Sequence, residues 1–288
     1  MVHLFQCNEI AHKYFSNVKK EIDLAGRSPY IKLFLASRDK GSESYAKVMI
    51  KKFTEAGIIS DLARVDSYGE LERKLFLLKD EEEVTGGFVF YPINFSEAKD
   101  SYFMSIVPEF KDIEGLSSHN IYRLFRYERN FPRSGCKAVV PCTAKAVIKT
   151  LLDENVKIEG KDVVILNKSY ALGAPLRRMF DNLGATVTAC DINTKKHSIE
   201  YYLKNADIVV TAVPKKEELF DDSCLKKGVS VIDCSFEGNF DFEKISNVAG
   251  NVSSRQSGNY IGPVTTSMAA VNTLYLFNYE NYLRSSKP

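Results

Sequence analysis

Several features that would indicate particular classes of protein are missing from this chain of 288 residues. It has no tryptophan, and its four histidines, His3, His12, His119 and His197, lack the spacing of metal ligands. We therefore expect no metal site. The six cysteines form no C-x-x-C pair, and the first twenty residues lack the apolar core of an export signal. Reduced thiols in a cytoplasmic protein are the expectation.

Long apolar runs and an excess of one charge are also absent. No segment approaches the ~20 apolar residues of a membrane span, so we expect no membrane partner. The 39 basic and 37 acidic residues leave a net charge of only +2, which argues against a nucleic-acid partner. The remaining composition, 44% hydrophobic and 26% charged, is that of an ordinary globular protein with room for one or two domains.

The most informative stretch runs from residue 163 to residue 191. An apolar strand (163–166) leads into a polar turn, a helix begins near Gly173 and ends at Gly184, and a second strand (185–190) ends on Asp191. In a dinucleotide-binding fold the free amides of such a helix N-terminus bind a pyrophosphate, and a carboxylate like Asp191 accepts from the adenosine ribose. The usual G-x-G-x-x-G is absent, so an ordinary strand–helix–strand crossover is the alternative interpretation.

The rest of the chain alternates between strand-like and helix-like patterns. Helical periodicity extends from Leu4 to Leu24, and residues 29–92 alternate strand, helix, strand, helix, strand, with Gly86-Gly87 ahead of the last strand. Thr143 is a plausible N-cap for a helix to Leu152. Further strands are predicted at 207–211 and 229–233, and a last helix from Thr266 to about 283. The pattern predicts an α/β fold with a parallel sheet in each of two domains.

Eight stretches resemble, in this order, the methylenetetrahydrofolate dehydrogenase/cyclohydrolase family. They are the helix around Tyr45, GGFVFYPI, KDIEGL (111–116), PCTAKAVIKTL (141–151), LNKSYALGAP (166–175), ATVTACD (185–191), ADIVVTAVP (206–214) and IGPVTTSMAAVNT (261–273). The resemblance implies an N-terminal folate-binding catalytic domain over 1–142, completed by the C-terminal helix 264–288. It also implies a Rossmann NAD-binding domain over 143–263, an active-site cleft between the domains, and a homodimer.

The resemblance assigns functional residues to both domains. For folate binding and catalysis they are Tyr45, Met49, Phe90, Pro92, Glu114, Gly262 and Pro263. For the cofactor they are Cys142, Thr143, Asn167, Lys168, Ser169, Gly173, Asp191, Thr211, Val213 and Pro214. Simpler interpretations remain open: Tyr45 and Met49 as packing residues, Glu114 as a solvated acid, and Thr211, Val213 and Pro214 as an ordinary strand end.

Departures from the family pattern bear on the chemistry. Bifunctional members carry Tyr-x-x-x-Lys in the first-domain helix, where this chain has Met49, and a Gln where it has Phe90. Cyclohydrolysis needs a group that manages water and protons, whereas hydride transfer mainly needs alignment. The resemblance is therefore nearest to the monofunctional NAD-dependent members known from fungi, and Glu114 in place of Asp fits that group.

The expected activity is oxidation of 5,10-methylenetetrahydrofolate to the methenyl form with NAD⁺ and without cyclohydrolase activity. Asp191 favours NAD because a carboxylate there repels a 2′-phosphate, although Lys195 and Lys196 could serve NADP. Two alternatives remain. One is an NADP-dependent bifunctional enzyme that uses another lysine, such as Lys52, and the other is a catalytically silent folate- or nucleotide-binding protein.

Overall fold

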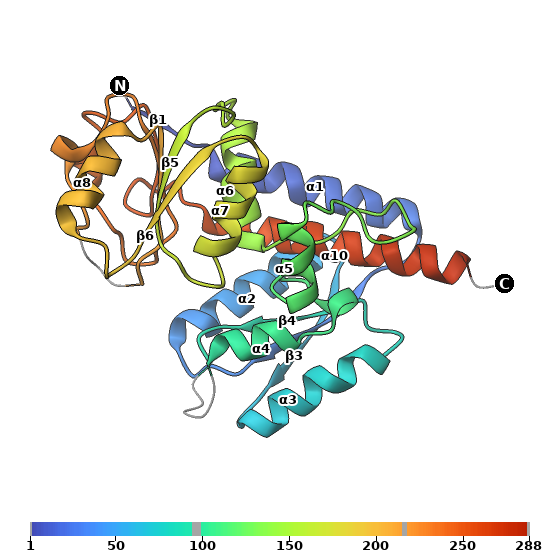
Figure 1. Cartoon of the computed structure of the whole chain (residues 1–288). Helices are drawn as coiled ribbons and strands as arrows, with labels where there is room; N and C mark the ends of the chain where they lie inside the picture. Colours follow the sequence, from blue (N-terminus) through green and yellow to red (C-terminus); the bar gives the residue numbers. More distant parts are fainter. Residues whose placement is uncertain (1, 94–98, 215–217, 287–288) are drawn as a thin grey trace. The chain divides into compact units, whose positions relative to one another are not determined.

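The chain folds into two compact units (Figure 1). The computed structural model describes residues 2–93, 99–214 and 218–286. The six-stranded unit consists of the residues up to Ala11 together with Thr143–Thr265, and the three-stranded unit consists of His12–Cys142 together with the residues from Thr266 onward. Within the described residues, no helix has the length and apolar character needed to cross a membrane.

The six-stranded unit is built on one parallel sheet. Its strands, in spatial order, are β1 (His3–Leu4), β9 (Asn251–Ser253), β8 (Ser230–Asp233), β7 (Ile208–Thr211), β5 (Asp162–Leu166) and β6 (Thr186–Cys190). Every pair of neighbours is parallel. From β5 the chain moves outward to β6 and then returns across β5 to β7. Ligands bind at such a reversal of direction, at the carboxyl ends of the strands.

Helices on both faces of this sheet bury its apolar strands. They are α6 (Cys142–Asp153), α7 (Gly173–Asn182) and α8 (Lys196–Asn205), with a short α9 (Phe242–Ile245). Helix α7 packs on β5 and β6, while α8 lies on the opposite face (Figure 1). Val164, Val209 and Val231 on successive strands share one core with Leu203 of α8. Strands buried on both faces explain the continuous apolar runs in the sequence.

The beginning of the chain differs from the sequence prediction. Residues 3–4 form the edge strand β1, paired with β9, and helix α1 (Cys7–Ala25) begins only after it. The Glu154 carboxylate accepts from the Gln6 amide at 2.8 Å and lies 2.9 Å from the His3 ring, which holds this strand in place. A two-residue strand is too short to show a period of its own. The first eleven residues thus group with the six-stranded unit rather than with the predicted N-terminal domain.

The three-stranded unit has a parallel sheet in the order β3 (Ile59–Arg64), β2 (Tyr30–Leu35) and β4 (Gly86–Phe90). Its helices are α2 (Lys40–Glu55), α3 (Tyr68–Leu77), α4 (Asp100–Ile106), α5 (Ser118–Phe125), most of α1, and α10 (Gly262–Ser285) from Thr266 onward. Helices α2 and α3 lie on opposite faces of the sheet (Figure 1). This confirms the predicted two-domain α/β class.

The sequence suggested that Gly86 and Gly87 precede the strand, but in the structure they are the first two residues of β4. A Cβ on Gly86 would lie 2.8 Å from the Ile113 side chain and 3.1 Å from that of Leu276 in α10. A Cβ on Gly87 would lie 2.6 Å from Leu78 on the other face. The strand therefore carries two glycines because elements on both faces approach its backbone closely.

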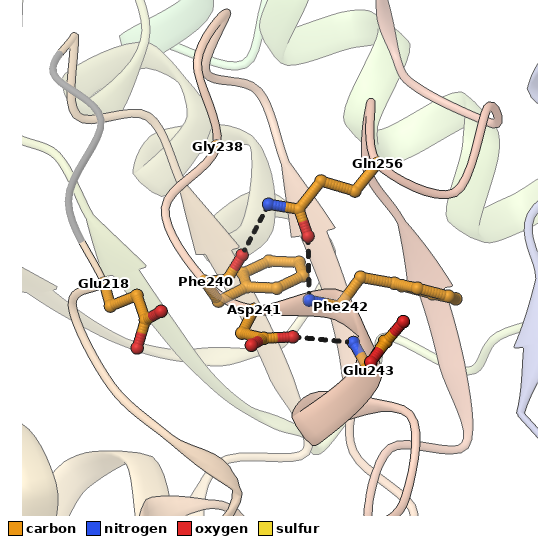
Figure 2. A pocket seen from close by; sticks show the side chains of 7 residues that line it. All are labelled: Glu218, Gly238, Phe240, Asp241, Phe242, Glu243 and Gln256. Atoms are coloured by element: carbon orange, nitrogen blue, oxygen red, sulfur yellow. Dashed lines mark hydrogen bonds between the residues drawn. The ribbon is translucent and has the colours of Figure 1, made fainter.

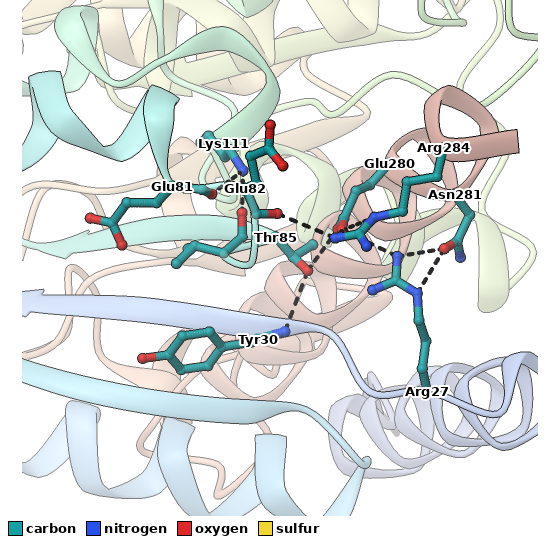
Figure 3. A network of polar contacts seen from close by, with 10 residues as sticks. Arg27, Tyr30, Glu81, Glu82, Thr85, Lys111, Glu280, Asn281 and Arg284 are labelled. Atoms are coloured by element: carbon teal, nitrogen blue, oxygen red, sulfur yellow. Dashed lines mark hydrogen bonds and ion pairs between the residues drawn. The ribbon is translucent and has the colours of Figure 1, made fainter. Parts of the chain in front are cut away.

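Helix α10 is anchored to the three-stranded unit by a polar network near its C-terminal end (Figure 3). Arg27 donates to Asn281 at 2.9 Å, pairs with Glu280 at 3.2 Å, and stacks on the Phe277 ring at 4.2 Å. Glu280 also accepts from the Thr85 hydroxyl at 3.1 Å, next to the start of β4. Residues 195 to 254 positions apart are thus joined.

Other differences are local. Helices α4 and α5 were not predicted, because their segments are short and rich in aromatic and polar residues. Thr143 is not an N-cap, since α6 already begins at Cys142. Helix α10 begins at Gly262, four residues before the predicted start, with Pro263 in its first turn. Proline is common there because the first helical amides need no partner within the helix.

Candidate active site

The predicted folate residues of α2 and β4 form an aromatic cluster on one face of the three-stranded sheet. The Tyr45 ring meets Phe90 edge-on, with centroids 5.7 Å apart at 90°, and Phe88 at 6.5 Å. Met49, one helical turn from Tyr45, is 0% exposed, and Phe90 is 1% exposed. Neither a thioether nor a phenyl ring titrates. The two positions that differ from the bifunctional pattern are therefore dry and apolar.

The Tyr45 ring is half-buried, and its hydroxyl is fixed from α10. Burial raises the pKa of the Tyr45 phenol, an effect that a hydrogen bond with Thr266 partly offsets. The hydroxyl therefore stays neutral over the whole physiological range. Because its orientation is fixed, the exposed part of the ring offers a constant surface for stacking.

Glu114 is a half-buried carboxyl group in an environment that disfavours its ionisation. Burial, with the nearby charges of Asp112 and Asp100, holds the pKa of Glu114 well above the ordinary glutamate value. Within the described part of the chain, no residue donates a hydrogen bond to this carboxyl. An unsatisfied, half-buried acid is costly to keep and is typical of ligand sites. This favours a binding role over that of a solvated loop acid.

The loop that carries Glu114 is shaped by its neighbour Asp112, which is 1% exposed. The Asp112 carboxylate accepts from the amides of Gly115 at 2.8 Å and Ser117 at 2.7 Å, and from the Asn120 side chain at 2.9 Å. Gly115 has φ +77°, and a Cβ there would lie 2.5 Å from the Val140 carbonyl carbon. Only glycine fits this position. The sequence KDIEGL thus encodes the loop as well as the acid at its apex.

Asn272 of α10 secures the backbone on both sides of this loop. Its side-chain amide, 0% exposed, donates to the carbonyls of Ile113 at 2.9 Å and Val140 at 2.8 Å. The Cys142 amide donates to the Glu114 carbonyl at 3.1 Å, and the Cys142 thiol donates to the Ile113 carbonyl at 3.4 Å. Cys142 therefore has a positioning role, and its thiol is buried.

Three other residues assigned with the folate group have simpler surroundings. Pro92 is exposed and follows a cis peptide bond at Tyr91, whose carbonyl accepts from Ser42 at 3.3 Å. Gly262 and Pro263 are half-buried in the first turn of α10. They belong to the six-stranded unit, whereas Tyr45, Phe90 and Glu114 belong to the three-stranded one.

The predicted dinucleotide loop follows β5 in the six-stranded unit and is organised by Asn167. Its side-chain oxygen accepts from the amides of Ser169 at 2.8 Å and Gly173 at 3.0 Å, while its amide donates to the Ala212 carbonyl after β7 at 2.8 Å. Asn167 thus bridges β5 and β7, where the chain changes direction. A Cβ on Gly173 would lie 2.2 Å from the Asn167 carbonyl oxygen. This cradle of Asn167 and Gly173 thus packs the start of α7 tightly on the loop after β5, as the last glycine of a dinucleotide-binding loop does.

The sequence suggested that the first amides of α7 are free, but in the structure they have hydrogen-bond partners. The Gly173 amide donates to Asn167, the Ala174 amide donates to the Ser169 carbonyl at 3.0 Å, and residue 175 is a proline without an N–H. The helix dipole still favours an anion at this end. The exposed Lys168 and Ser169 side chains are therefore the better candidates for contact with phosphate.

Asp191, at the end of β6, is held in place by local contacts. Its carboxylate accepts from the Asn193 amide at 3.0 Å and lies 3.4 Å from the Lys168 ammonium. Partial burial acts to raise the pKa of Asp191, but the Asn193 and Lys168 contacts outweigh it and leave that pKa below the usual range. The group is therefore a carboxylate at neutral pH, as a ribose hydroxyl acceptor must be. Lys168 lies beside it, so the carboxylate is not an isolated negative charge.

The remaining cofactor candidates lie near the ends of β7 and α6. The Thr211 hydroxyl is buried and donates to Asp233 of β8 at 3.0 Å, so it serves the sheet. The Val213 amide donates to Asn239 at 2.9 Å, and Pro214 is exposed. Thr143 is half-buried in the first turn of α6.

Four residues that shape the site were not predicted from the sequence: Asp233, Asn239, Asn272 and Thr266. Each acts on a residue distant along the chain, although Asn272 and Thr266 lie within the IGPVTTSMAAVNT stretch.

The six-stranded unit also has a surface pocket of about 600 Å³ (Figure 2). Its lining includes Glu218, Asp241 and Glu243, and Gln256 bridges the backbones of Phe240 and Phe242 across it. None of the predicted site residues lines it. Three carboxylates make it unsuitable for a phosphate. In the described residues, no group of three or more His, Cys, Asp or Glu side chains is arranged to hold a metal ion.

The strand reversal, the loop after β5 and the acid at the end of β6 define the six-stranded unit as a dinucleotide-binding domain of the Rossmann type. The sequence agrees with this assignment. Residues 141–281 match the NAD(P)-binding domain of tetrahydrofolate dehydrogenase/cyclohydrolase, and residues 5–114 match the catalytic domain of the same family. The chain belongs to the tetrahydrofolate dehydrogenase/cyclohydrolase family.

Individual relatives cover almost the whole chain. The bifunctional protein FolD of Caldanaerobacter subterraneus subsp. tengcongensis is 32% identical over 283 residues, covering 94% of this chain and 95% of that protein. A 5,10-methylenetetrahydrofolate dehydrogenase from the silkworm Bombyx mori is 25% identical, with a TM-score of 0.84 and full coverage of both chains. The Trypanosoma brucei dehydrogenase-cyclohydrolase, solved with NADP and an inhibitor, is 25% identical with a TM-score of 0.87, covering 100% of this chain and 99% of that one.

Proposed function

We propose that this protein oxidises 5,10-methylenetetrahydrofolate to the methenyl form by hydride transfer to NAD⁺, and that it lacks cyclohydrolase activity. The family and its relatives support the dehydrogenase. The burial and the apolar character of Met49 and Phe90 support the absence of cyclohydrolase activity. Both side chains are fully buried, and Phe90 packs edge-on against Tyr45, at positions where bifunctional members present a lysine and a glutamine.

Burial of these two side chains explains why one activity is lost and the other kept. Hydrolysis of the methenyl bridge needs a group that directs water and moves protons, and neither a thioether nor a phenyl ring does so. Oxidation of the methylene bridge needs no such group, because the two bridge nitrogens stabilise the developing cation themselves. The protein mainly has to align the reacting carbon. An apolar wall beside Tyr45 also keeps water away.

The described residues divide the remaining work. Tyr45 offers a ring for stacking, and Glu114 offers a carboxyl to the N–H groups of the pterin, held by Asp112, Gly115 and Asn272. On the cofactor side, Asn167 and Gly173 form the cradle, Lys168 and Ser169 face the phosphates, and Asp191 accepts from the ribose. When bound, the dinucleotide supplies a hydride acceptor at C4 of its nicotinamide ring.

The choice between NAD and NADP depends on the surroundings of Asp191. Its ionised carboxylate disfavours a 2′-phosphate, which supports NAD. The second candidate is an NADP-dependent enzyme, favoured by the Lys168 ammonium 3.4 Å from that carboxylate and by the bifunctional relatives. A cation at this distance neutralises part of the repulsion.

The direct test supplies methylenetetrahydrofolate with NAD⁺ or NADP⁺ and measures the formation of methenyl product and reduced cofactor. We expect turnover with NAD⁺, and methenyl product that accumulates. In a second assay, methenyltetrahydrofolate is supplied directly, and its hydrolysis should not exceed that of an enzyme-free control, while a bifunctional relative serves as the positive control. Enzyme-dependent hydrolysis, or turnover with NADP⁺ alone, would contradict the proposal. Folate binding without any turnover would indicate a silent binding protein.

Replacement of Asp191 tests the cofactor assignment separately. Asp191→Ser removes the ribose acceptor and should raise the KM for NAD⁺ about 10- to 100-fold, the range expected for a lost charged hydrogen bond. The ratio of kcat/KM for NADP⁺ over NAD⁺ should rise, because Lys168 is released. Asp181→Ser, an exposed acid of α7, is the matched control. An unchanged cofactor ratio in Asp191→Ser would remove this residue from the site.

A further inference from the structure

A further cation lies at the carboxyl edge of the six-stranded sheet. Arg255 lies in the loop after β9, and its guanidinium carbon lies over two aromatic rings, 4.2 Å from the Phe236 centroid and 4.4 Å from the Tyr260 centroid. Within the described residues, its side chain makes no hydrogen bond or ion pair. The two rings contact the guanidinium without accepting a hydrogen bond in their ring planes, so its N–H donors remain available for an anion.

Hydrogen bonds within the loop that carries Arg255 close it into a turn. Residues 254 and 259 form an antiparallel bridge, with the Ser254 amide donating to the Asn259 carbonyl at 2.8 Å. The Ser257 hydroxyl closes the turn by donating to the Ser254 carbonyl at 2.7 Å, and Gly258 takes φ +76°. The arginine therefore projects from a tight, hydrogen-bonded turn.

Both rings are also held by the fold. A Cβ on Gly262 would lie 2.8 Å from the Tyr260 ring, so this ring packs on the first turn of α10. Phe236 lies in the loop after β8, where Asp233 accepts from the amides of Ser235 at 2.8 Å and Asn239 at 2.9 Å. Phe236 is 67% exposed, so its ring reaches the guanidinium from the surface of the unit. The two rings fix the orientation of the guanidinium in advance.

A fixed guanidinium with free edge donors suits a carboxylate or a phosphate, which it can bind through two parallel hydrogen bonds. The side of the sheet is also the one at which this fold binds ligands. The position of Arg255 along that edge distinguishes between a phosphate of the dinucleotide and a carboxylate. Strand β9 lies three strands from β5, and neighbouring strands are about 4.8 Å apart, so this loop begins about 14 Å from the predicted phosphate cradle. A phosphate in that cradle is too far away for direct contact.

The nicotinamide half of a dinucleotide with its adenosine at β6 extends toward β7 and β8. An anion bound farther along this edge, beside β9, then belongs to the second substrate and not to the dinucleotide. Tetrahydrofolate carries its carboxylates on the glutamyl group, across the aminobenzoyl ring from the carbon that is oxidised. We propose that Arg255, clamped by Phe236 and Tyr260, binds a glutamyl carboxylate of the folate substrate; this assignment rests on the proposed function and extends it.

The test compares folates with and without a glutamyl tail. The substrates are methylenetetrahydrofolate with one glutamate, the same compound with several, and methylenetetrahydropteroate, which has none. For Arg255→Gln, the ratio of kcat/KM for the glutamylated substrate over the pteroate should fall about tenfold, the effect of losing one charge-assisted pair. Arg255→Lys keeps the positive charge but not the paired N–H donors of the guanidinium, so this ratio should fall less than in Arg255→Gln. Phe236→Ala, which frees one face of the arginine, should fall between wild type and Arg255→Gln.

Arg73→Gln, an exposed arginine of α3, is the matched control. An equal loss on the pteroate substrate, or no loss on any substrate, would overturn the proposal. A rise in the KM for NAD⁺ in place of the folate effect would assign Arg255 to a dinucleotide phosphate. Equilibrium binding of the glutamylated and tail-free folates, measured without dinucleotide, gives the same ratio without turnover. Failure of the dehydrogenase proposal and failure of the Arg255 proposal are therefore distinguishable.

Discussion

Replacing Glu114 with glutamine is expected to lower kcat/KM for methylenetetrahydrofolate about 100-fold and, at the same time, to stabilise the folded protein at neutral pH. The loss of activity is that of one buried, charge-assisted interaction with the pterin. The gain in stability follows from the raised pKa of Glu114, which burial and the Asp112 charge produce. A carboxyl that folding pushes toward the neutral form makes folding less favourable once the pH allows ionisation.

The pH dependence has a definite sign. Between the pKa of an unfolded glutamate, about 4.3, and the higher pKa of folded Glu114, the native state binds more protons than the unfolded state. This group therefore lowers the free energy of unfolding progressively as the pH rises through that interval. The glutamine variant lacks the effect. Its Tm should exceed that of the wild type by an amount that grows from acid to neutral pH.

Steady-state kinetics and thermal unfolding at several pH values measure both effects of this substitution. Glu114→Asp, which keeps a carboxylate of the kind usual in the family, is the matched control and should retain part of the activity. A glutamine variant with kcat/KM within threefold of the wild type would identify Glu114 as an ordinary loop acid. A Tm difference that does not vary with pH would show that its pKa is not raised.

Gly173→Ala should abolish measurable dinucleotide binding, with KM for NAD⁺ raised at least about 100-fold. The added Cβ would lie 2.2 Å from the Asn167 carbonyl oxygen and 2.7 Å from its side-chain oxygen, so the loop after β5 must move. Overpacking of this kind costs about 1–3 kcal/mol of stability. The loop that bridges β5 and β7 loses its shape, and the phosphate cradle is lost with it.

The control for this glycine is Gly69→Ala on the exposed side of α3, where the added Cβ meets nothing within 4 Å. This change should stabilise the helix by up to about 1 kcal/mol. Calorimetry measures dinucleotide binding, and thermal unfolding reports stability. Folate binding, measured alone, should change less than about twofold in Gly173→Ala. Dinucleotide affinity within threefold of the wild type would show that the cradle is not at this loop.

The unit from β5 to β6 could be predicted from sequence because its signals are local. An apolar strand, a polar turn, a glycine at a close approach and a helix with apolar spacing all lie within thirty residues. The resemblance located Tyr45, Met49, Phe90 and Glu114 in the same way, as short motifs in order. The functional roles assigned to these residues stay predictions.

What the sequence could not show depends on contacts between distant residues. Strands β1 and β9 have two and three residues, too few for a periodic pattern. Asn272 donates to Ile113, 159 positions earlier. The sequence also gives no sign that Asn167 and Ser169 accept hydrogen bonds from the amides at the start of α7. The clamp on Arg255 likewise joins loops that follow different strands, and no spacing in the sequence identifies it.

The pairing of β1 with β9 has a consequence for the order of events during synthesis. Leu4 emerges from the ribosome well before its partner Val252, which is made roughly 250 residues later, about 12 to 50 s at typical elongation rates. During that interval Leu4 has no strand to pair with. Helix α10, which supplies Asn272 and Thr266 to the smaller unit, is made later still. Neither unit can be completed until Val252 and helix α10 have been made, so a chain interrupted before them lacks the Asn272 contacts of the folate loop as well as a finished sheet.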